Sequence, residues 1–159
     1  MKLKQKILLI ALLPLLVLGV AITVVSNKKI NDAMTETISD GLRGTATAVR
    51  STFRKMNSES YRLNENNELV KGDFNISQQV DMADDIKEVA NIDVSIYYGE
   101  TRYMTSAKDE NGQRVLGTLT DKDVLDTVLG QGKEYFTDHV MVSGLSYFGY
   151  YIPLFDFET

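Results

Sequence analysis

The chain has 159 residues, 22 of them acidic and 17 basic, and it contains no cysteine. Apart from an apolar run near the N-terminus, the 134 residues from Ser26 to Thr159 are enough for one compact domain. All of the acidic residues lie in that part, which makes nucleic acid a poor partner, because phosphate binding needs clustered Lys and Arg. The absence of cysteine excludes disulfides, a thiolate metal site and a cysteine nucleophile.

An uncharged run, ILLIALLPLLVLGVAITVV, occupies residues 7–25. As a helix rising ~1.5 Å per residue, it has roughly the length needed to cross the hydrocarbon layer of a bilayer. A secretory signal peptide is the rival interpretation, but its apolar region is usually about 7 to 15 residues long and ends at a small-x-small cleavage site. The sequence Val24-Val25-Ser26 fits such a site poorly. We therefore expect an uncleaved transmembrane signal anchor.

The charges on either side of this run indicate its orientation. Three lysines lie within residues 1–6, whereas Lys28 and Lys29 on the other side are offset by Asp32 and Glu36. By the positive-inside rule, residues 1–6 are cytoplasmic and the larger part of the chain is extracytoplasmic. The expected location is the cell membrane, with a single span.

Residues 26–60 contain no proline, and an apolar or near-apolar side chain recurs about every 3.7 positions. Polar residues fill the other faces, so we expect an amphipathic stalk helix that continues from the membrane span. Gly41 and Gly44 each cost such a helix up to about 1 kcal/mol relative to alanine, and they indicate either close helix approach or simply a weak point. The recurring positions are Ile30, Met34, Ile38, Leu42, Thr45, Val49, Phe53 and Met56.

A loop and a short helix are expected after the stalk. Residues 64–75 are rich in Asn and Gly and too polar for the core, so a loop is predicted there, with a short extended piece at 68–70. Ser77 can cap a helix over residues 77–90. The positions of that helix predicted to face inward are Val80, Ala83, Ile86 and Val89.

From Ile92 onward the apolar pattern has a period of two, which predicts strands. Thr120–Asp123 has the form of a capping box and predicts a helix with Val124, Leu125, Val128 and Leu129 facing inward. Helices segregated from one antiparallel sheet define an α+β domain. The predicted strands are 92–98, 102–106, 113–117, 134–142 and 146–152, with a turn at 109–112 between the second and third.

Several short motifs are similar to those of one known family. They are Tyr98-Gly99-Glu100-Thr101-Arg102, Thr105, Asp109-Glu110-Asn111-Gly112 followed by Val115-Leu116-Gly117-Thr118, and YFGYYIPL at residues 147–154. Together they resemble the extracytoplasmic single-Cache domains of bacterial methyl-accepting chemotaxis proteins, and the resemblance covers residues 26–154. It implies a PAS-like antiparallel sheet covered by short helices over residues 61–159, a small-molecule pocket between sheet and helix, and homodimers packed along the stalk helices.

Members of that family also carry a further strand, a second membrane helix, a HAMP linker and a cytoplasmic coiled-coil signalling region. This sequence stops at Phe155–Thr159. We therefore expect a chain truncated at the C-terminal end of its sensor domain, with one edge strand missing from the sheet.

Five residues are expected to bind the ligand. Arg102 follows a tight turn, where its guanidinium can hold a carboxylate through two parallel hydrogen bonds; the alternative is a solvated turn arginine. Thr105 can donate a hydroxyl hydrogen bond to the same ligand, or it is simply a strand residue. Tyr98, Tyr147 and Tyr151 can form pocket walls with polar tips, although most tyrosines in sheets only pack. The ligand expected is a small organic molecule, with a short carboxylate favoured.

No catalytic, metal or cofactor site is expected. His139, the only histidine, lies beside Asp138 without a Ser or Cys partner in a motif. The acid pairs Asp84–Asp85 and Asp121–Asp123 lie on or at the start of predicted helices, where acids favour the N-terminal dipole or face water. The segment Gly41–Gly44 lacks the lysine of a phosphate-binding loop. We expect the protein not to be an enzyme.

The favoured function is therefore small-molecule sensing outside the cytoplasm for a chemotaxis transducer, with ligand binding coupled through the stalk helix to the membrane. The same sensor can equally serve a membrane histidine kinase or a diguanylate cyclase. A pilin-like structural subunit is a further alternative, but it needs a glutamate early in its apolar helix, and residues 7–25 contain no acid. The expected partners are a small organic ligand, the membrane and a second copy of the chain.

Overall fold

The computed structural model describes residues 3–56, 58–142 and 144–156, and for residues 3–11 it describes the backbone only. The predicted cytoplasmic segment at residues 1–6 lies partly outside the described residues, as do the last three positions of the predicted sensor domain. The chain forms two compact units, Met1–Ile38 and Ser39–Thr159.

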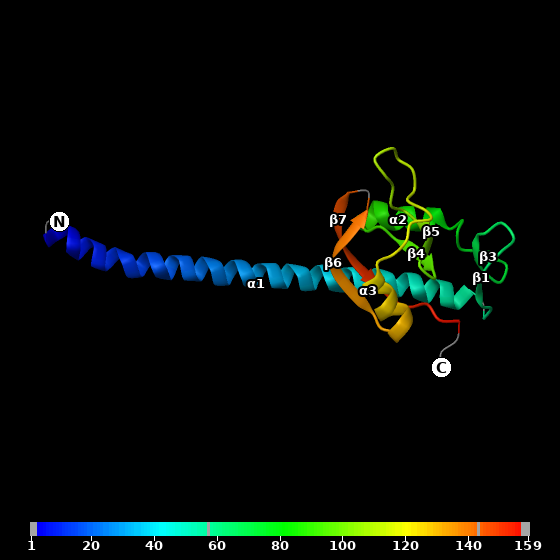
Figure 1. Cartoon of the computed structure of the whole chain (residues 1–159), viewed down its shortest axis with the longest axis horizontal. Helices are drawn as coiled ribbons and strands as arrows, with labels where there is room; N and C mark the ends of the chain where they lie inside the picture. Colours follow the sequence, from blue (N-terminus) through cyan, green and yellow to red (C-terminus); the bar gives the residue numbers. More distant parts are fainter. Residues whose placement is uncertain (1–2, 57, 143, 157–159) are drawn as a thin grey trace. The chain divides into compact units, whose positions relative to one another are not determined.

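One long helix, α1 (Leu3–Met56), runs through both units (Figure 1). The prediction that the apolar run and the stalk form one continuous helix is confirmed, although the helix ends at Met56 and not at residue 60. Pro14 lies inside the helix, where it removes one backbone hydrogen bond. The membrane-span pattern and the stalk pattern therefore belong to a single element.

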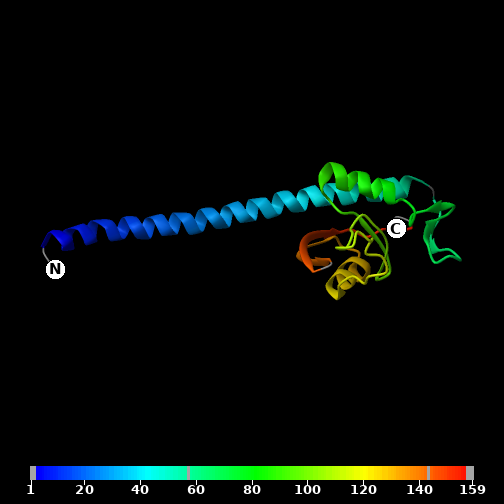
Figure 2. The ribbon, with the colours of Figure 1, turned by 90° about the horizontal axis from the view of Figure 1, so that it is seen from above.

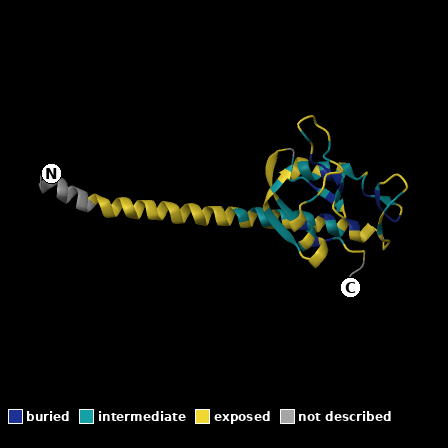
Figure 3. Cartoon of the chain, in the orientation of Figure 1, coloured by how far each residue is buried: buried dark blue, intermediate teal, exposed yellow. Residues whose placement is uncertain are grey.

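The apolar side chains described in the membrane-span segment of α1 remain exposed. Every side chain described from Leu12 to Met34 is exposed (Figure 3). Among the described residues, α1 contains one segment whose length and apolar composition suit a membrane span. An N-terminal signal sequence has the same character, so length and composition alone support both interpretations.

The second unit consists of small antiparallel sheets and short helices, which confirms the predicted α+β class. The single sheet expected from the sequence is instead divided into three: β1–β2–β3, β4–β5 and β6–β7. The elements are β1 (Tyr61–Leu63), β2 (Leu69–Lys71), β3 (Phe74–Asn75), α2 (Val80–Ala90), β4 (Ser95–Tyr98), β5 (Thr101–Thr105), α3 (Lys122–Val124), the π-helical turn η1 (Leu125–Leu129), β6 (Tyr135–Val142) and β7 (Leu145–Tyr151).

The predicted polar loop at residues 64–75 is wrong in part, because strands lie there and Leu69 and Lys71 of β2 are buried. The Lys71 ammonium donates a hydrogen bond to the carbonyl oxygen of Phe53 at 3.3 Å and lies 4.8 Å from the centre of the Tyr61 ring. A cation is favoured near the carbonyl groups at a helix C-terminus. Lys71 therefore joins β2 to the last turn of α1.

The predicted helix caps are also wrong. The N-cap residue of α2 is Gln79, and the Ser77 hydroxyl instead accepts a hydrogen bond from the Leu69 amide at 2.8 Å. The N-cap of α3 is Asp121 rather than Thr120, and neither N-cap side chain makes a capping hydrogen bond.

Two predicted inward positions and one predicted strand differ in the structure. Val89 is 88% exposed and Leu129 is 54% exposed, because each lies near the end of its helix, beyond the packed surface. Residues 113–117 form no strand, since Gly117 adopts φ +70° and interrupts an extended conformation. The amide of Gly117 instead donates to the carbonyl of Arg102 at 2.9 Å, which places this segment beside the start of β5.

The core joins the last turns of α1 to α2 and to the β4–β5 hairpin. Figure 2 shows α1 and α2 side by side on one side of this hairpin, with α3 on the other. Phe53 of α1 has none of its surface exposed, and its ring centre lies 6.3 Å from that of Phe74. The buried members of the core are Val49, Phe53, Leu69, Ile76, Ala83, Val94, Ile96 and Met104.

Replacing Phe53 by alanine removes the largest fully buried side chain from this core. We expect Phe53→Ala to reduce the free energy of unfolding by about 3–5 kcal/mol, through lost transfer energy and the cavity left behind. Urea denaturation of the full chain in detergent micelles measures the effect. Val89→Ala is the control, since an exposed position is expected to change stability by less than about 0.5 kcal/mol. Similar losses for both variants would contradict the assignment of the core.

Candidate ligand-binding site

A bulge in β5 decides which side chains share a face of the β4–β5 hairpin. Ser95 pairs with Thr105 and Ile96 with Met104, but Tyr97 pairs with Arg102, so one extra residue, Tyr103, lies in β5. Paired residues of an antiparallel ladder project from the same face, and neighbours along a strand alternate. The bulge therefore brings Arg102 to the face that carries Ser95, Tyr97 and Thr105.

This polar face lies opposite the core. Ile96 and Met104 project toward α1 and α2, where both are buried. Residues 107–121 connect β5 to α3, and backbone hydrogen bonds at Arg102 hold Gly117 and Thr118 along the free edge of β5. The hairpin thus separates an apolar side from a polar side, and the connecting segment reaches the polar side at the Val115 carbonyl.

Arg102 is buried, with 7% of its surface exposed, so it is not the solvated turn arginine of the alternative interpretation. Its Nε donates to the Tyr97 hydroxyl at 2.8 Å, and its Nη2 makes a short hydrogen bond to the same oxygen. Its Nη1 donates to the Val115 carbonyl at 3.3 Å, and the guanidinium carbon lies 5.1 Å from the centre of the Tyr97 ring. Both acceptors described for this buried cation are neutral.

Tyr151 of β7 joins this group. Its ring centre lies 6.4 Å from that of Tyr97, at an interplanar angle of 54°. Burial, followed by the charge of the neighbouring Tyr97, raises the pKa of Tyr151 to about 12, and Arg102 opposes the rise. Burial also raises the pKa of Tyr97, again opposed by Arg102. Two phenols and a guanidinium therefore share a poorly solvated space, and both phenols are neutral at ordinary pH. We call Tyr97, Arg102 and Tyr151 the arginine cluster.

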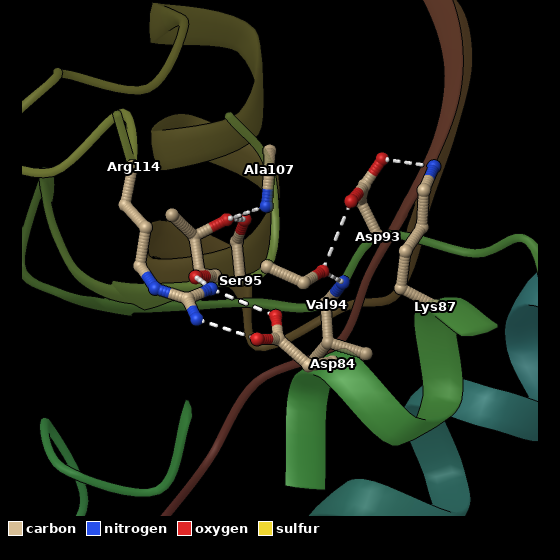
Figure 4. Close-up of polar contacts among 9 residues, drawn as sticks. Asp84, Lys87, Asp93, Val94, Ser95, Ala107 and Arg114 are labelled. Atoms are coloured by element: carbon tan, nitrogen blue, oxygen red, sulfur yellow. Dashed lines mark hydrogen bonds and ion pairs between the residues drawn. The ribbon is translucent and has the colours of Figure 1, made fainter. Parts of the chain in front are cut away.

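Thr105 lies on the same face, but its hydroxyl serves the local structure. It forms a hydrogen bond with the Ser95 hydroxyl at 2.7 Å and accepts another from the Ala107 amide at 3.0 Å. The Thr105 carbonyl accepts a hydrogen bond from Arg114 Nη1 at 2.8 Å. Arg114 also forms a two-point ion pair with Asp84 of α2, at 2.8 and 2.6 Å (Figure 4). This network holds α2 against the end of β5.

Tyr98 lies elsewhere. It pairs with Thr101 at the turn of the hairpin, on the opposite face from Tyr97, and its ring meets that of Tyr103 edge-on at 6.4 Å. Its exposed fraction is 41%. The structure therefore does not bring Tyr98 together with Arg102 and Tyr151.

Tyr147 lines a separate open pocket of about 390 Å³ between α2, the end of β5 and β7. The floor is a polar network in which Asp93 accepts hydrogen bonds from Lys87 at 2.7 Å and from the Ser106 hydroxyl at 3.0 Å (Figure 4). The other lining residues are Asp84, Glu88 and Lys108. The five predicted residues thus divide between this pocket, the arginine cluster and the packing of the hairpin.

Tyr97 is the site residue that the sequence analysis did not select. Its position in an alternating strand marked it only as facing away from the core. Tyr97 could have been selected only by pairing it with Arg102 across the tight turn. That pairing depends on the bulge, and the alternation of apolar and polar residues in the sequence does not reveal the bulge.

Metal chemistry finds no support among the described residues. No three of their His, Asp or Glu side chains gather as a metal would require. His139 Nε2 lies 3.6 Å from Asp138, and both side chains are largely exposed.

Close packing fixes the position of Tyr151 in β7. A Cβ atom at Gly149 would lie 2.4 Å from Val140 Cγ2 and 3.0 Å from the Tyr151 ring. We expect Gly149→Ala to displace that ring and to lower the free energy of unfolding by about 1–3 kcal/mol. Gly130→Ala is the control in urea denaturation, since its Cβ would meet only the Leu125 carbonyl, at 3.8 Å. Equal stability of the two variants would contradict the close approach.

The raised pKa of Tyr151 predicts a stability change in alkali. A phenol whose pKa is near 10 when unfolded and about 12 when folded contributes stability below pH 10, and that contribution is lost as pH rises toward 12. We expect Tyr151→Phe to flatten this part of the stability curve, measured by urea denaturation between pH 8 and 12. Val89→Ala, which changes an exposed position and removes no ionisable group, is the control and is expected to leave the slope unchanged. A wild-type slope in Tyr151→Phe would show that this phenol is not buried.

Comparison with protein families identifies the second unit. Residues 61–158 match the model of the family described as single cache domain 3. Comparisons with curated proteins and with solved structures found no match. The matched segment contains the β4–β5 hairpin, the arginine cluster and the pocket beside Tyr147. It covers more than half of the chain, and Cache domains are extracytoplasmic small-molecule-sensing domains. The chain therefore belongs to the single cache domain 3 family.

Proposed function

We propose that this chain is the membrane-anchored sensor of a bacterial chemotaxis transducer, and that Arg102 binds a carboxylate group of a small organic ligand. A carboxylate ligand is supported by the buried guanidinium of Arg102. Its described hydrogen-bond acceptors, the Tyr97 hydroxyl and the Val115 carbonyl, are both neutral. A buried cation without an anionic partner is costly. The charge of Asp121 helps to raise the pKa of both Tyr97 and Tyr151, but the hydrogen bonds described for Arg102 go to neutral groups, so a ligand carboxylate would supply the directly bound anion.

The geometry of the Arg102 contacts also favours a carboxylate. Nε and Nη2 form the edge of a guanidinium that holds a carboxylate through two parallel hydrogen bonds. In this structure both nitrogen atoms donate to a single oxygen, that of Tyr97. A carboxylate offers two oxygens to the same edge, so the ligand would displace the Tyr97 hydroxyl from one or both donors. The Tyr151 ring would then form an apolar wall for the rest of the ligand.

The membrane anchor and a dimer complete the proposed sensor. The exposed apolar residues of α1 from Leu12 to Val25 support insertion into a bilayer, with the second unit outside the cell. Added Cβ atoms at Gly41 and Gly44 would meet nothing within 4 Å, so a second α1 helix can approach closely there. We infer a homodimer packed along α1, and no enzymatic activity.

The output domain of this sensor is proposed from motif similarity. The resemblance of the hairpin motifs to those of methyl-accepting chemotaxis proteins favours a chemotaxis transducer. A histidine kinase or a diguanylate cyclase carrying the same sensor is the alternative, and the coding sequence that follows these residues in the gene separates the three. The absence of an acidic residue in the apolar run, together with the Cache match, speaks against a pilin-like subunit.

Substitution of Arg102 tests the ligand site. We expect a screen of acetate, propionate, succinate and malate against the full chain in lipid nanodiscs to find a ligand that raises the melting temperature. Arg102→Gln is expected to weaken its affinity by about 30-fold or more, because it removes one partner of a buried charged pair. Isothermal titration calorimetry measures the affinity.

One further variant is a control for this experiment, and another tests the proposed displacement of the Tyr97 hydroxyl. Arg62→Gln removes an exposed arginine from β1 and is expected to leave the affinity unchanged. Tyr97→Phe keeps the ring but frees the guanidinium edge, so binding is expected to be retained. If no carboxylate binds, or if Arg102→Gln folds and binds as tightly as the wild type, the proposed site is wrong.

A further inference from the structure

Strand β7 touches two functional parts of the second unit with adjacent residues. Tyr150 and Tyr151 are neighbours, so their side chains project from opposite faces of the strand. Tyr151 belongs to the arginine cluster, with its ring centre 6.4 Å from that of Tyr97. Tyr150 instead donates its hydroxyl to Glu134 Oε2 at 2.7 Å. A shift of the β7 backbone would therefore move both contacts together.

Glu134 continues this connection to α1. Its Oε2 atom also accepts from Arg43 Nε at 3.0 Å, so Arg43, Glu134 and Tyr150 form a polar chain from the helix to the strand. The hydrogen bond from Tyr150, followed by the charges of Arg43 and Arg50, lowers the pKa of the Glu134 carboxyl group. The carboxylate is therefore charged at neutral pH and accepts from both partners at once. We call Arg43, Glu134 and Tyr150 the α1 link.

The half-buried end of β7, which carries both contacts, is closely packed on one side. A Cβ atom at Gly149 would clash with Val140 at 2.4 Å and would lie 3.0 Å from the Tyr151 ring. The Phe136 ring lies 6.3 Å from that of Tyr150 and stacks on Phe148 at 6.0 Å. Close packing of this kind transmits a displacement instead of absorbing it.

The α1 link is also weak enough to respond to a ligand. The Arg43 side chain is 58% exposed, and an exposed ion pair contributes little to stability. Val49 and Phe53, in contrast, hold α1 to the core through complete or nearly complete burial. A ligand with limited binding energy can therefore shift the α1 link between formed and broken states while the core stays intact.

We propose that the α1 link is the contact through which occupancy of the arginine cluster is communicated to α1, with β7 as the connecting strand. This inference rests on the proposed function, since it assumes that the cluster is the ligand site and α1 the output element. The competing route runs through α2, which the two-point ion pair between Asp84 and Arg114 joins to the segment after β5, and which packs on α1 at Ala83.

Hydrogen exchange in a double-mutant design distinguishes the two routes. The input is Arg102→Gln, which alters the cluster without requiring a known ligand, with Tyr97→Phe as a second input should that variant fail to fold. The output is amide exchange of residues 39–50 in the full chain in lipid nanodiscs, followed by mass spectrometry. Each input is measured in three backgrounds: wild type, Tyr150→Phe and Asp84→Asn. Tyr150→Phe deletes only the hydroxyl that binds Glu134, and Asp84→Asn weakens the ion pair of the competing route.

We expect the input to change α1 exchange by on the order of three- to tenfold in the wild-type and Asp84→Asn backgrounds, the scale of one hydrogen bond. In the Tyr150→Phe background the same input is expected to have no further effect, since the link is already broken. Three outcomes would overturn the proposal. The input could have equal effects in all three backgrounds, its effect could be lost only in the Asp84→Asn background, or neither input could have any effect on exchange in α1. Failure of the carboxylate screen alone would instead count against the proposed function, because no ligand is used here.

Discussion

The register of the β4–β5 hairpin is the constraint on which the second unit depends. The extra residue at Tyr103 lets Met104 and Ile96 face the helices while Arg102 turns to the other side with Tyr97. A regular ladder would place Arg102 and Thr105 on opposite faces, since three positions separate them. Either the Arg102 guanidinium would then project into the apolar core, or the polar side would lack this cation. One bulge thus separates the surface that stabilises the fold from the surface proposed to bind a ligand.

Sequence periodicity predicted most of the regular elements because burial produces it. The stripe that includes Val49 and Phe53 identified α1, and alternation identified β4 through β7. Features set by single tertiary contacts were not predicted. Lys71 is buried because a helix terminus lies beside it, and Ser77 binds the Leu69 amide because β2 passes close by. Neither contact produces a periodic pattern in the sequence from which it could be predicted.

The residues of the candidate site also differ in how well the sequence predicted them. Arg102 and Tyr151 were selected from motifs, and the structure brings them together with Tyr97. Tyr98 was selected from the same turn motif, but its place beyond the bulge puts it on the face of Tyr103. Motif similarity locates a strand and its turn; the direction of each side chain depends on the local twist and register. Tyr147 lies in a pocket of its own, which no motif marks as distinct from the arginine cluster.

The position of Arg102 has an implication for how quickly an anion can arrive. From Ser26 onward acidic side chains outnumber basic ones, whereas the cationic group of the arginine cluster is almost hidden from solvent. A carboxylate in solution would first meet net repulsion, and attraction would begin only at short range. Dissolved salt screens the long-range part far more than the buried part. At the proposed carboxylate site, added salt would therefore speed the binding of an acid, the reverse of the behaviour of a receptor with a basic exterior.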